Sequence, residues 1–345
     1  MEAFLEELFA EMNSVVLAGV IVVTIMVLGK SADWLVDAAV ALSEKSRIPK
    51  VVIGATVVSL GTTAPEAAVS VLAAIQGNPG LALGNAVGSI ICDTGLILGL
   101  ASLIAPLKLN RRIVNRQGWI QLGAGFALAV FSLPFSNLGV AFTEGGNLPR
   151  VVGFVFLLAL AVYIIVSVRW ARASDDDWLP EDLEADLADS TTVVALKLAG
   201  SLMLVLAAAT VLIPAVAEAA RRFSVPDSVI AATLVAFGTS LPELVTAVKA
   251  AMRGHGELAV GNVIGADILN VLFVAGAAAA VTPGGLVADP HFFVVLFPAM
   301  LFILLVFRIG IIFSGDSLKR PFGVVLLAVY AFVTLVSYLI SGPQA

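Results

Sequence analysis

Two six-residue segments of this chain repeat one order of residue types: Gly-Thr-Thr-Ala-Pro-Glu at residues 61–66 and Gly-Thr-Ser-Leu-Pro-Glu at residues 238–243. A proline inside a helix removes one backbone donor and clashes with the preceding turn, so each segment should release backbone carbonyls just before the proline. Two hydroxyl residues precede each proline and a glutamate follows it. Because hard cations such as Ca²⁺ and Na⁺ take carbonyl, hydroxyl and carboxylate oxygens, the pattern predicts a cation site around Glu66 and Glu243.

A second pair of segments, residues 84–93 and 261–270, holds most of the remaining polarity within apolar sequence. Residues spaced by four share one helix face, and here they are Asn85, Ser89 and Asp93 in the first segment and Asn262, Ala266 and Asn270 in the second. We interpret Asp93 as a further cation ligand. Both segments also contain glycines four residues apart, Gly84 with Gly88 and Gly261 with Gly265, a spacing typical of closely packed helices.

The composition requires a bilayer around these segments. Hydrophobic residues make up 60% of the 345 positions and charged residues 13%, with a mean hydropathy of +1.04, whereas a soluble domain carries about 25% charged residues. Ionisable residues inside a membrane are costly and usually functional, which favours a ligand role for both glutamates. The net charge of −6, without a basic patch, argues against a nucleic-acid partner, and the single cysteine, Cys92, excludes an internal disulfide.

A helix needs roughly 20 mainly apolar residues to cross the hydrocarbon, and on that criterion the sequence predicts ten spans. They lie near residues 14–43, 49–76, 80–104, 116–134, 149–170, 192–222, 226–253, 257–282, 290–310 and 320–341. We therefore expect an all-α membrane protein with proline-broken helices at a central site.

An internal repeat organises these spans. A shift of 177 residues aligns positions 49–99 with 226–276 without a gap, and 21 of the 51 pairs are identical. Each half contains five spans, an odd number, so the second copy should be inverted in the membrane, an arrangement typical of secondary transporters. We divide the chain into a first five-helix repeat (1–171), an acidic loop (172–191) and a second, inverted five-helix repeat (192–345).

The basic residues predict the orientation. The loops after the odd-numbered spans hold fourteen lysines and arginines, and the opposite side holds three, Arg150, Arg221 and Arg222. By the positive-inside rule the acidic loop is cytoplasmic and both termini are outside. Within the first span we expect a structural ion pair between Lys30 and Asp33, with a gate or interface role as the alternative, and we expect Lys249 to reach the cytoplasmic surface.

Together the four segments resemble the two α-repeats of the cation/Ca²⁺ exchanger superfamily, in particular of the prokaryotic sodium/calcium exchangers. The motif G-T-[ST]-x-P-E followed by G-N-x-x-G-S-[ND]-x-x-[ND] defines those repeats, and both copies stand here within the two 51-residue windows. Two copies at a fixed spacing make the resemblance specific.

The resemblance implies four central ligands, Glu66, Glu243, Asp93 and Asn270. It also implies supporting ligation, by side chains or backbone carbonyls, from Thr62, Thr63, Thr239, Ser240 and Ser89; Asn85 and Asn262 are further candidates. Two positions depart from the family pattern. Ala266 replaces a serine, which removes one hydroxyl ligand from the second half, and Ile90 replaces a polar residue that Asp267 preserves in the second copy.

The function implied is secondary antiport of Na⁺ against Ca²⁺ by alternating access, in a prokaryotic plasma membrane, with the ions as cargo, no cofactor and a monomer as the working expectation. An H⁺/Ca²⁺ or K⁺-dependent Na⁺/Ca²⁺ exchanger is the alternative, and a cation channel is a weaker one. An intramembrane hydrolase finds no support, because the sequence contains neither H-E-x-x-H nor G-x-S-x-G.

Overall fold

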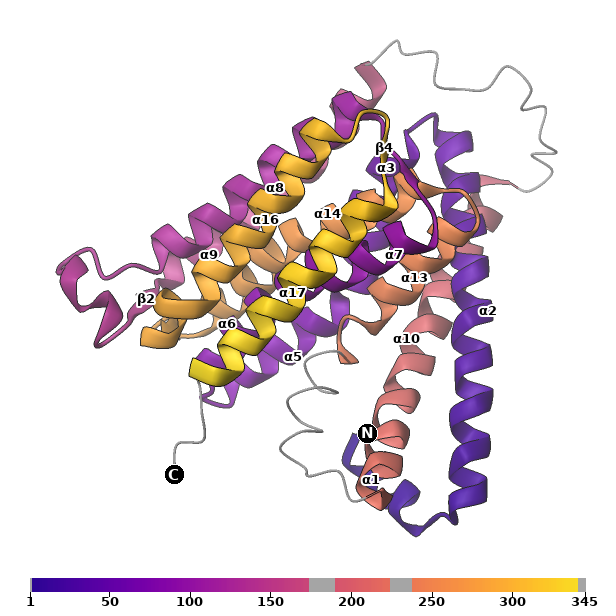
Figure 1. Ribbon diagram of the computed structural model, residues 1–345, viewed down its shortest axis with the longest axis horizontal. Coiled ribbons are helices and arrows are strands. Elements are labelled where there is room, and N and C mark those ends of the chain that lie inside the picture. Colours follow the sequence, from indigo (N-terminus) through magenta and orange to yellow (C-terminus); the bar gives the residue numbers. More distant parts are fainter. Residues whose placement is uncertain (1, 174–189, 224–237, 341–345) are drawn as a thin grey trace.

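The computed structural model describes residues 2–173, 190–223 and 238–340 (Figure 1). The predicted acidic loop at 172–191 and the first half of the predicted span at 226–253 therefore lie mostly outside the described residues. The helices of the first half, which include π-helical and 3₁₀ segments labelled η, are α1 (Glu2–Glu11), α2 (Ser14–Ser46), α3 (Lys50–Ile53), η1 (Gly54–Val58), α4 (Ser59–Thr62), α5 (Ala64–Ile75), α6 (Pro79–Cys92), η2 (Asp93–Ile97), α7 (Leu98–Ile104), α8 (Arg111–Phe131), η3 (Leu138–Phe142) and α9 (Arg150–Ala173).

The second half is built in the same way. Its described helices are α10 (Thr191–Arg222), α13 (Leu241–Met252), α14 (Gly256–Leu269), η5 (Asn270–Ala275), α15 (Gly276–Val281), η6 (Phe292–Leu296), α16 (Phe297–Phe313) and α17 (Arg320–Ile340). Four short strands complete the described chain, β1 (Leu107–Lys108), β2 (Gly146–Leu148), β3 (Leu286–Ala288) and β4 (Ser317–Leu318).

Within the described ranges, seven helices are long and apolar enough to cross a membrane, or up to eight if one bent pair counts as a span. Helices also stand at the other predicted span positions, but they do not meet that criterion. The helix α8 carries three arginines, and the described α13 has only 12 residues. The total of ten spans stays a prediction.

The bent pair contains the first proline segment. Residues Lys50–Thr62 and Ala64–Ile75 form two helices whose axes differ by 44°, with Thr63 at the break. Pro65 lies in the first turn of α5, where a helix tolerates proline because the backbone N–H there has no partner within the helix. In the second half, α13 begins directly after Ser240, and Pro242 likewise lies in its first turn.

The helices α2 and α10 pack along each other at one edge of the molecule, on the right in Figure 1. Two ion pairs tie α2 to α13: Lys249 Nζ lies 3.2 Å from Asp33 Oδ2, and an Arg253 guanidinium nitrogen lies 2.6 Å from Asp37 Oδ1. The expected Lys30–Asp33 pair was therefore wrong, because Asp33 faces α13 while the Lys30 ammonium lies 5.7 Å from the centre of the Trp34 ring. Lys249 is paired and its side chain is 26% exposed, so its expected reach to the cytoplasmic surface stays a prediction.

The two halves are joined by two antiparallel strand pairs. Strand β1 pairs with β4, and β2 pairs with β3. In the same way α7 packs on α17 and α9 on α15. Exchanging the halves in chain order converts β1–β4 into β3–β2 and α7–α17 into α15–α9, which is the pattern expected of two copies related by a two-fold axis. Their opposite orientation in a membrane stays a prediction.

Helix α14 lies at the centre, with nearly all its residues buried. Its glycines permit this position: a Cβ on Gly261 would stand 2.2 Å from the Val51 carbonyl oxygen, and one on Gly265 would stand 2.4 Å from the Ala55 Cα. This confirms the packing interpretation for the second glycine pair. For Gly84 and Gly88 it stays untested, because the equivalents of Val51 and Ala55, Ser228 and Ala232, lie outside the described residues.

Candidate cation-binding site

The two motif glutamates meet at the contact between the halves. Thr63 Oγ1 donates a hydrogen bond of 3.1 Å to Glu243 Oε1, which connects the helix break of the first half to the first turn of α13. Glu66 and Glu243 are each 1% exposed, and each keeps one carboxylate oxygen, Oε2, without a hydrogen-bond partner. Helix α13 also contacts the π-helical segment η2, which begins at Asp93, so the third carboxylate belongs to a segment packed against the same helix.

The second pair of central residues also bridges the halves. Asn270 Nδ2 donates to Asp93 Oδ2 at 3.4 Å, while Asp93 Oδ1 and Asn270 Oδ1 have no partner. These residues are equivalent under the 177-residue shift, and each begins a π-helical segment, η2 or η5. Such segments widen the helical turn and recur at functional sites, and sequence periodicity alone did not predict them here.

The hydroxyl residues of the motifs divide into two groups. Ser89, Thr239 and Ser240 have buried hydroxyl oxygens without a hydrogen-bond partner. Thr62 Oγ1 instead donates to the Ser59 carbonyl at 3.3 Å, and Thr63 Oγ1 donates to Glu243 Oε1. The first group is therefore available to a ligand as it stands, and Thr62 offers lone pairs beyond its helix bond.

The two motif asparagines behave differently. Asn85 Nδ2 donates to the Glu66 backbone carbonyl at 3.3 Å and to Ser70 Oγ at 2.9 Å, so it joins α6 to α5 behind the ligand glutamate. Asn262 is fully buried, and neither its Oδ1 nor its Nδ2 has a partner. Asn85 thus positions Glu66, whereas Asn262 keeps its hydrogen-bonding capacity open.

Eight of the eleven expected ligand residues carry a buried polar side-chain atom without a hydrogen-bond partner. Buried polar atoms are normally paired, and each unpaired one costs free energy unless a ligand satisfies it. The eight are Glu66, Asp93, Glu243, Asn270, Ser89, Thr239, Ser240 and Asn262. Because all eight present oxygen atoms, the set fits a hard cation.

The carboxylates do not form a compact metal cluster. In the part of the chain that the structure describes, no three His, Cys, Asp or Glu side chains converge at metal-ligand spacing. A cation here would therefore combine one or two carboxylates with hydroxyl, amide and carbonyl oxygens, rather than sit among three charged groups. Mixed oxygen sets of this kind are usual for Ca²⁺.

A neighbouring buried polar cluster was missed by the sequence analysis. Asp267 Oδ2 accepts hydrogen bonds from Thr94 Oγ1 and from Gln121 Nε2, which also approaches Thr94 at 3.3 Å. Gln121 and Gln117 are both buried and lie one turn apart on α8. That spacing of two amides within a predicted span was the available signal.

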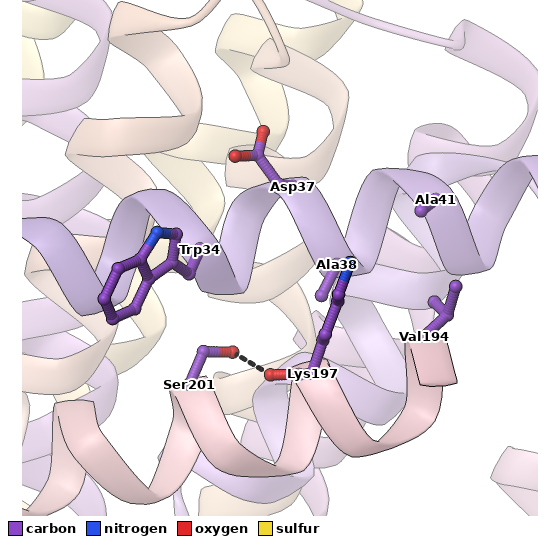
Figure 2. Close-up of a pocket in the computed structure, with 7 residues that line it drawn as sticks. All are labelled: Trp34, Asp37, Ala38, Ala41, Val194, Lys197 and Ser201. Atoms are coloured by element: carbon purple, nitrogen blue, oxygen red, sulfur yellow. Dashed lines mark hydrogen bonds between the residues drawn. The ribbon is translucent and has the colours of Figure 1, made fainter. Parts of the chain in front are cut away.

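The cavity whose lining residues are drawn in Figure 2 lies apart from the candidate ligand residues. It has a volume of about 580 Å³ and opens between α2 and α10, lined by Trp34, Asp37, Lys197, Ser201 and three small apolar residues. None of the eleven expected ligands lines it.

Comparisons with known proteins relate this chain to ion exchangers. A profile of the family described as sodium/calcium exchanger protein matches residues 16–169 and 193–339, on either side of the acidic segment. The chain is 32% identical to the sodium/calcium exchanger MaX1 of Methanosarcina acetivorans over 93% of this chain and 98% of that protein. It is 32% identical to the putative antiporter CaxA of Alkalimonas amylolytica over 76% and 80% of the two chains. A solved structure of the sodium-calcium exchanger NCX_Mj, soaked with zero Na⁺ and Ca²⁺, superimposes with a TM-score of 0.79 at 25% identity, covering 94% of this chain and 100% of that one.

Proposed function

The chain belongs to the sodium/calcium exchanger protein family, and from that premise we propose that it exchanges Na⁺ for Ca²⁺ across a membrane by alternating access. The observation that carries the proposal is the set of unpaired buried oxygens contributed by both halves, centred on Glu66 and Glu243. Two carboxylates match the charge of one Ca²⁺. The neutral oxygens around them suit Na⁺ as well, so the two ions compete for overlapping ligands.

The division of the ligands between the halves suits alternating access. Thr63 with Glu243, and Asp93 with Asn270, each bring one residue from either half. A movement of one helix group against the other would separate these partners. The site would then open to one side of the membrane at a time. Sites at the interface between repeats operate in this way in secondary transporters.

The two halves do not offer equal ligands for Na⁺. Ser89 presents a buried hydroxyl in the first half, whereas its equivalent, Ala266, is fully buried and has none. We infer that the second half holds Na⁺ less tightly. The Na⁺ dependence of transport should therefore reflect fewer or weaker sites than a serine-containing second motif would give.

Flux measurements in proteoliposomes test the exchange. Purified protein is reconstituted, and uptake of ⁴⁵Ca²⁺ is followed with an outward gradient of Na⁺, of H⁺ or of K⁺, imposed one at a time. We expect uptake driven by Na⁺ alone. A matched preparation of Glu243→Gln protein measures leakage.

Each of the other outcomes would identify a different class of transport protein. Uptake driven by a proton gradient without Na⁺ would make it an H⁺/Ca²⁺ exchanger, and a requirement for K⁺ together with Na⁺ would make it a K⁺-dependent exchanger. Uptake without any counter-gradient, abolished by Glu243→Gln, would identify a cation channel and refute antiport.

A further inference from the structure

A cavity of about 520 Å³ lies between α8 and α16, apart from the cation-binding residues. Its lining combines three arginines with an amide and three large apolar side chains. These residues are Arg111, Arg112, Asn115, Trp119, Arg308, Ile311 and Ile312. None of them has a part in the exchange proposed above.

Arg308 forms the floor of this cavity, and its guanidinium is incompletely satisfied. The residue is 2% exposed, donates through Nη2 to Asn115 Oδ1, and stacks over Trp119 with its Cζ 4.6 Å from the ring centre. Its Nε and Nη1 are buried without a hydrogen-bond partner. Across the described residues, no carboxylate forms an ion pair with Arg308 or Arg111. A buried cation without a counter-charge is costly, so this site calls for an anion.

The exposed residues that line the cavity are of two kinds, cationic and apolar. Arg111 is exposed at the start of α8, and it donates to the Ile312 carbonyl at 3.3 Å, which leaves further guanidinium donors available. Trp119 and Ile312 are 56% and 48% exposed on the outer faces of their helices. A ligand that suits both kinds of residue carries a negative head group and an apolar tail.

The position of the cavity agrees with such a ligand. Arg111 follows β1, and Arg308 lies near the end of α16, which leads into β4, so the β1–β4 pair marks this end of the molecule (Figure 1). The count of basic residues predicts that this end faces the cytoplasm. Anionic lipids concentrate in the cytoplasmic leaflet, and basic pockets between membrane helices bind their head groups.

We propose that this cavity binds the phosphate group of an anionic phospholipid. The phosphate oxygens accept hydrogen bonds from Arg111, whose guanidinium matches phosphate geometry, and the uncompensated positive charge of the buried Arg308 beneath them attracts the phosphate electrostatically. An acyl chain then lies along Trp119 and Ile312. Free phosphate shares the head-group chemistry but would not use this apolar surface.

Quenching of Trp119 by brominated lipid tests the site. A single-tryptophan protein, with Trp34, Trp170 and Trp178 replaced by Phe, is reconstituted in phosphatidylcholine vesicles containing either brominated phosphatidylglycerol or brominated phosphatidylcholine at equal mole fraction. We expect the brominated phosphatidylglycerol to associate more strongly with Trp119. Arg111→Gln should reduce that preference by about five-fold, the contribution of one basic residue near an anionic surface.

Arg116→Gln is the matched control, because Arg116 lies on the same helix but is not among the residues that line the cavity. In the unaltered protein it faces α9 instead, with its Cζ 4.2 Å from the ring centre of Trp170. It should leave the preference unchanged. Equal loss in both variants would mean attraction to the leaflet as a whole and would overturn a specific site. Equal quenching by the two lipids would overturn it too, and so would abolition of the preference by inorganic phosphate, which would identify a free-anion site. If Arg111→Gln does not fold, native mass spectrometry of the unaltered protein decides: it should retain phosphatidylglycerol in preference to phosphatidylcholine.

Discussion

Asp93 and Asn270 occupy the same position in the two copies, yet only one of them can carry charge. They share a hydrogen bond of 3.4 Å, and each retains an oxygen without a partner. Glu66 and Glu243, by contrast, are ionisable residues in both copies and are equally buried. At the scale of single residues, the site therefore combines a symmetric pair of carboxylates with an asymmetric pair of a carboxylate and an amide.

The glutamate pair is expected to be indispensable. Glu66→Gln and Glu243→Gln each remove half of the charge that balances Ca²⁺, so each should lower ⁴⁵Ca²⁺ uptake by more than about 100-fold, the upper end of the cost of losing an outer-shell partner of a metal. Both proteins should still elute as the unaltered protein does in gel filtration. Unchanged Ca²⁺ flux in either variant would remove the proposed site.

Asp93→Asn should behave differently. It leaves both glutamates, and the amide oxygen of the new side chain still faces Asn270, so substantial Ca²⁺ transport should remain. Protons compete with Ca²⁺ for carboxylates, so uptake by the unaltered protein should weaken as the solution is acidified from neutrality. The variant should show a shallower dependence because one competing carboxylate is gone. Initial rates measured against pH decide the matter, and inactivity equal to that of Glu66→Gln would make Asp93 an obligatory charged ligand.

At the scale of elements, close packing and ion pairing hold the ligand helices in different ways. Helix α14 is fixed by backbone contact with α3 and η1 through Gly54, Gly261 and Gly265. Helix α13 is instead tied to α2 by partly exposed ion pairs. The first kind of contact tolerates little change, whereas the second contributes modestly to stability.

Gly265→Ala should destabilise the protein. The added methyl group would overlap the Ala55 backbone, and overpacking of this kind costs about 1–3 kcal/mol. Thermal unfolding followed by tryptophan fluorescence in detergent should show a lower midpoint. Gly123→Ala on α8 is the control, because a Cβ there meets nothing within 4 Å. A midpoint for Gly265→Ala as high as that of the control would contradict the close approach.

The Asp33–Lys249 pair should be replaceable by its reverse. Each side chain is about one quarter exposed, so a double-mutant cycle with Asp33→Lys and Lys249→Asp should give a coupling energy of about 0.2–1 kcal/mol. The single variants place like charges together and should unfold at lower temperature than the double variant. Single and double variants that unfold together would show that the two side chains do not interact.

At the scale of the whole molecule, the sequence predicted what is repeated and missed what is paired across long distances. The candidate ligand residues could be proposed from the sequence because the same types stand twice at one spacing, and their ligand role stays a prediction. The partner of Asp33 lies 216 residues away on α13, and only the packing of α2 against that helix determines it. Asn85 shares a helix face with Ser89 and Asp93, yet its amide is used against Ser70, because periodicity gives a face but not the neighbour that meets it.

The orientation of the whole chain remains to be measured. Cysteine at Ser174, in a variant with Cys92 replaced by Ser, should resist an impermeant maleimide applied to intact cells, because the basic residues place that segment in the cytoplasm. Cysteine at Ser136, an exposed position in the loop after the fourth predicted span, should be labelled in the same assay. Labelling at Ser174 but not at Ser136 would invert the topology.

The strand pairs between the halves can form only after the second half has been synthesised. A chain emerges from the ribosome with its first half leading, so β1 and β2 are made well before β4 and β3, their only strand partners among the described residues. During that interval each early strand has an unpaired edge, and such an edge can pair with another chain. A protein truncated after the first half would lack both partner strands, so the edges of β1 and β2 would stay open to pairing with another chain.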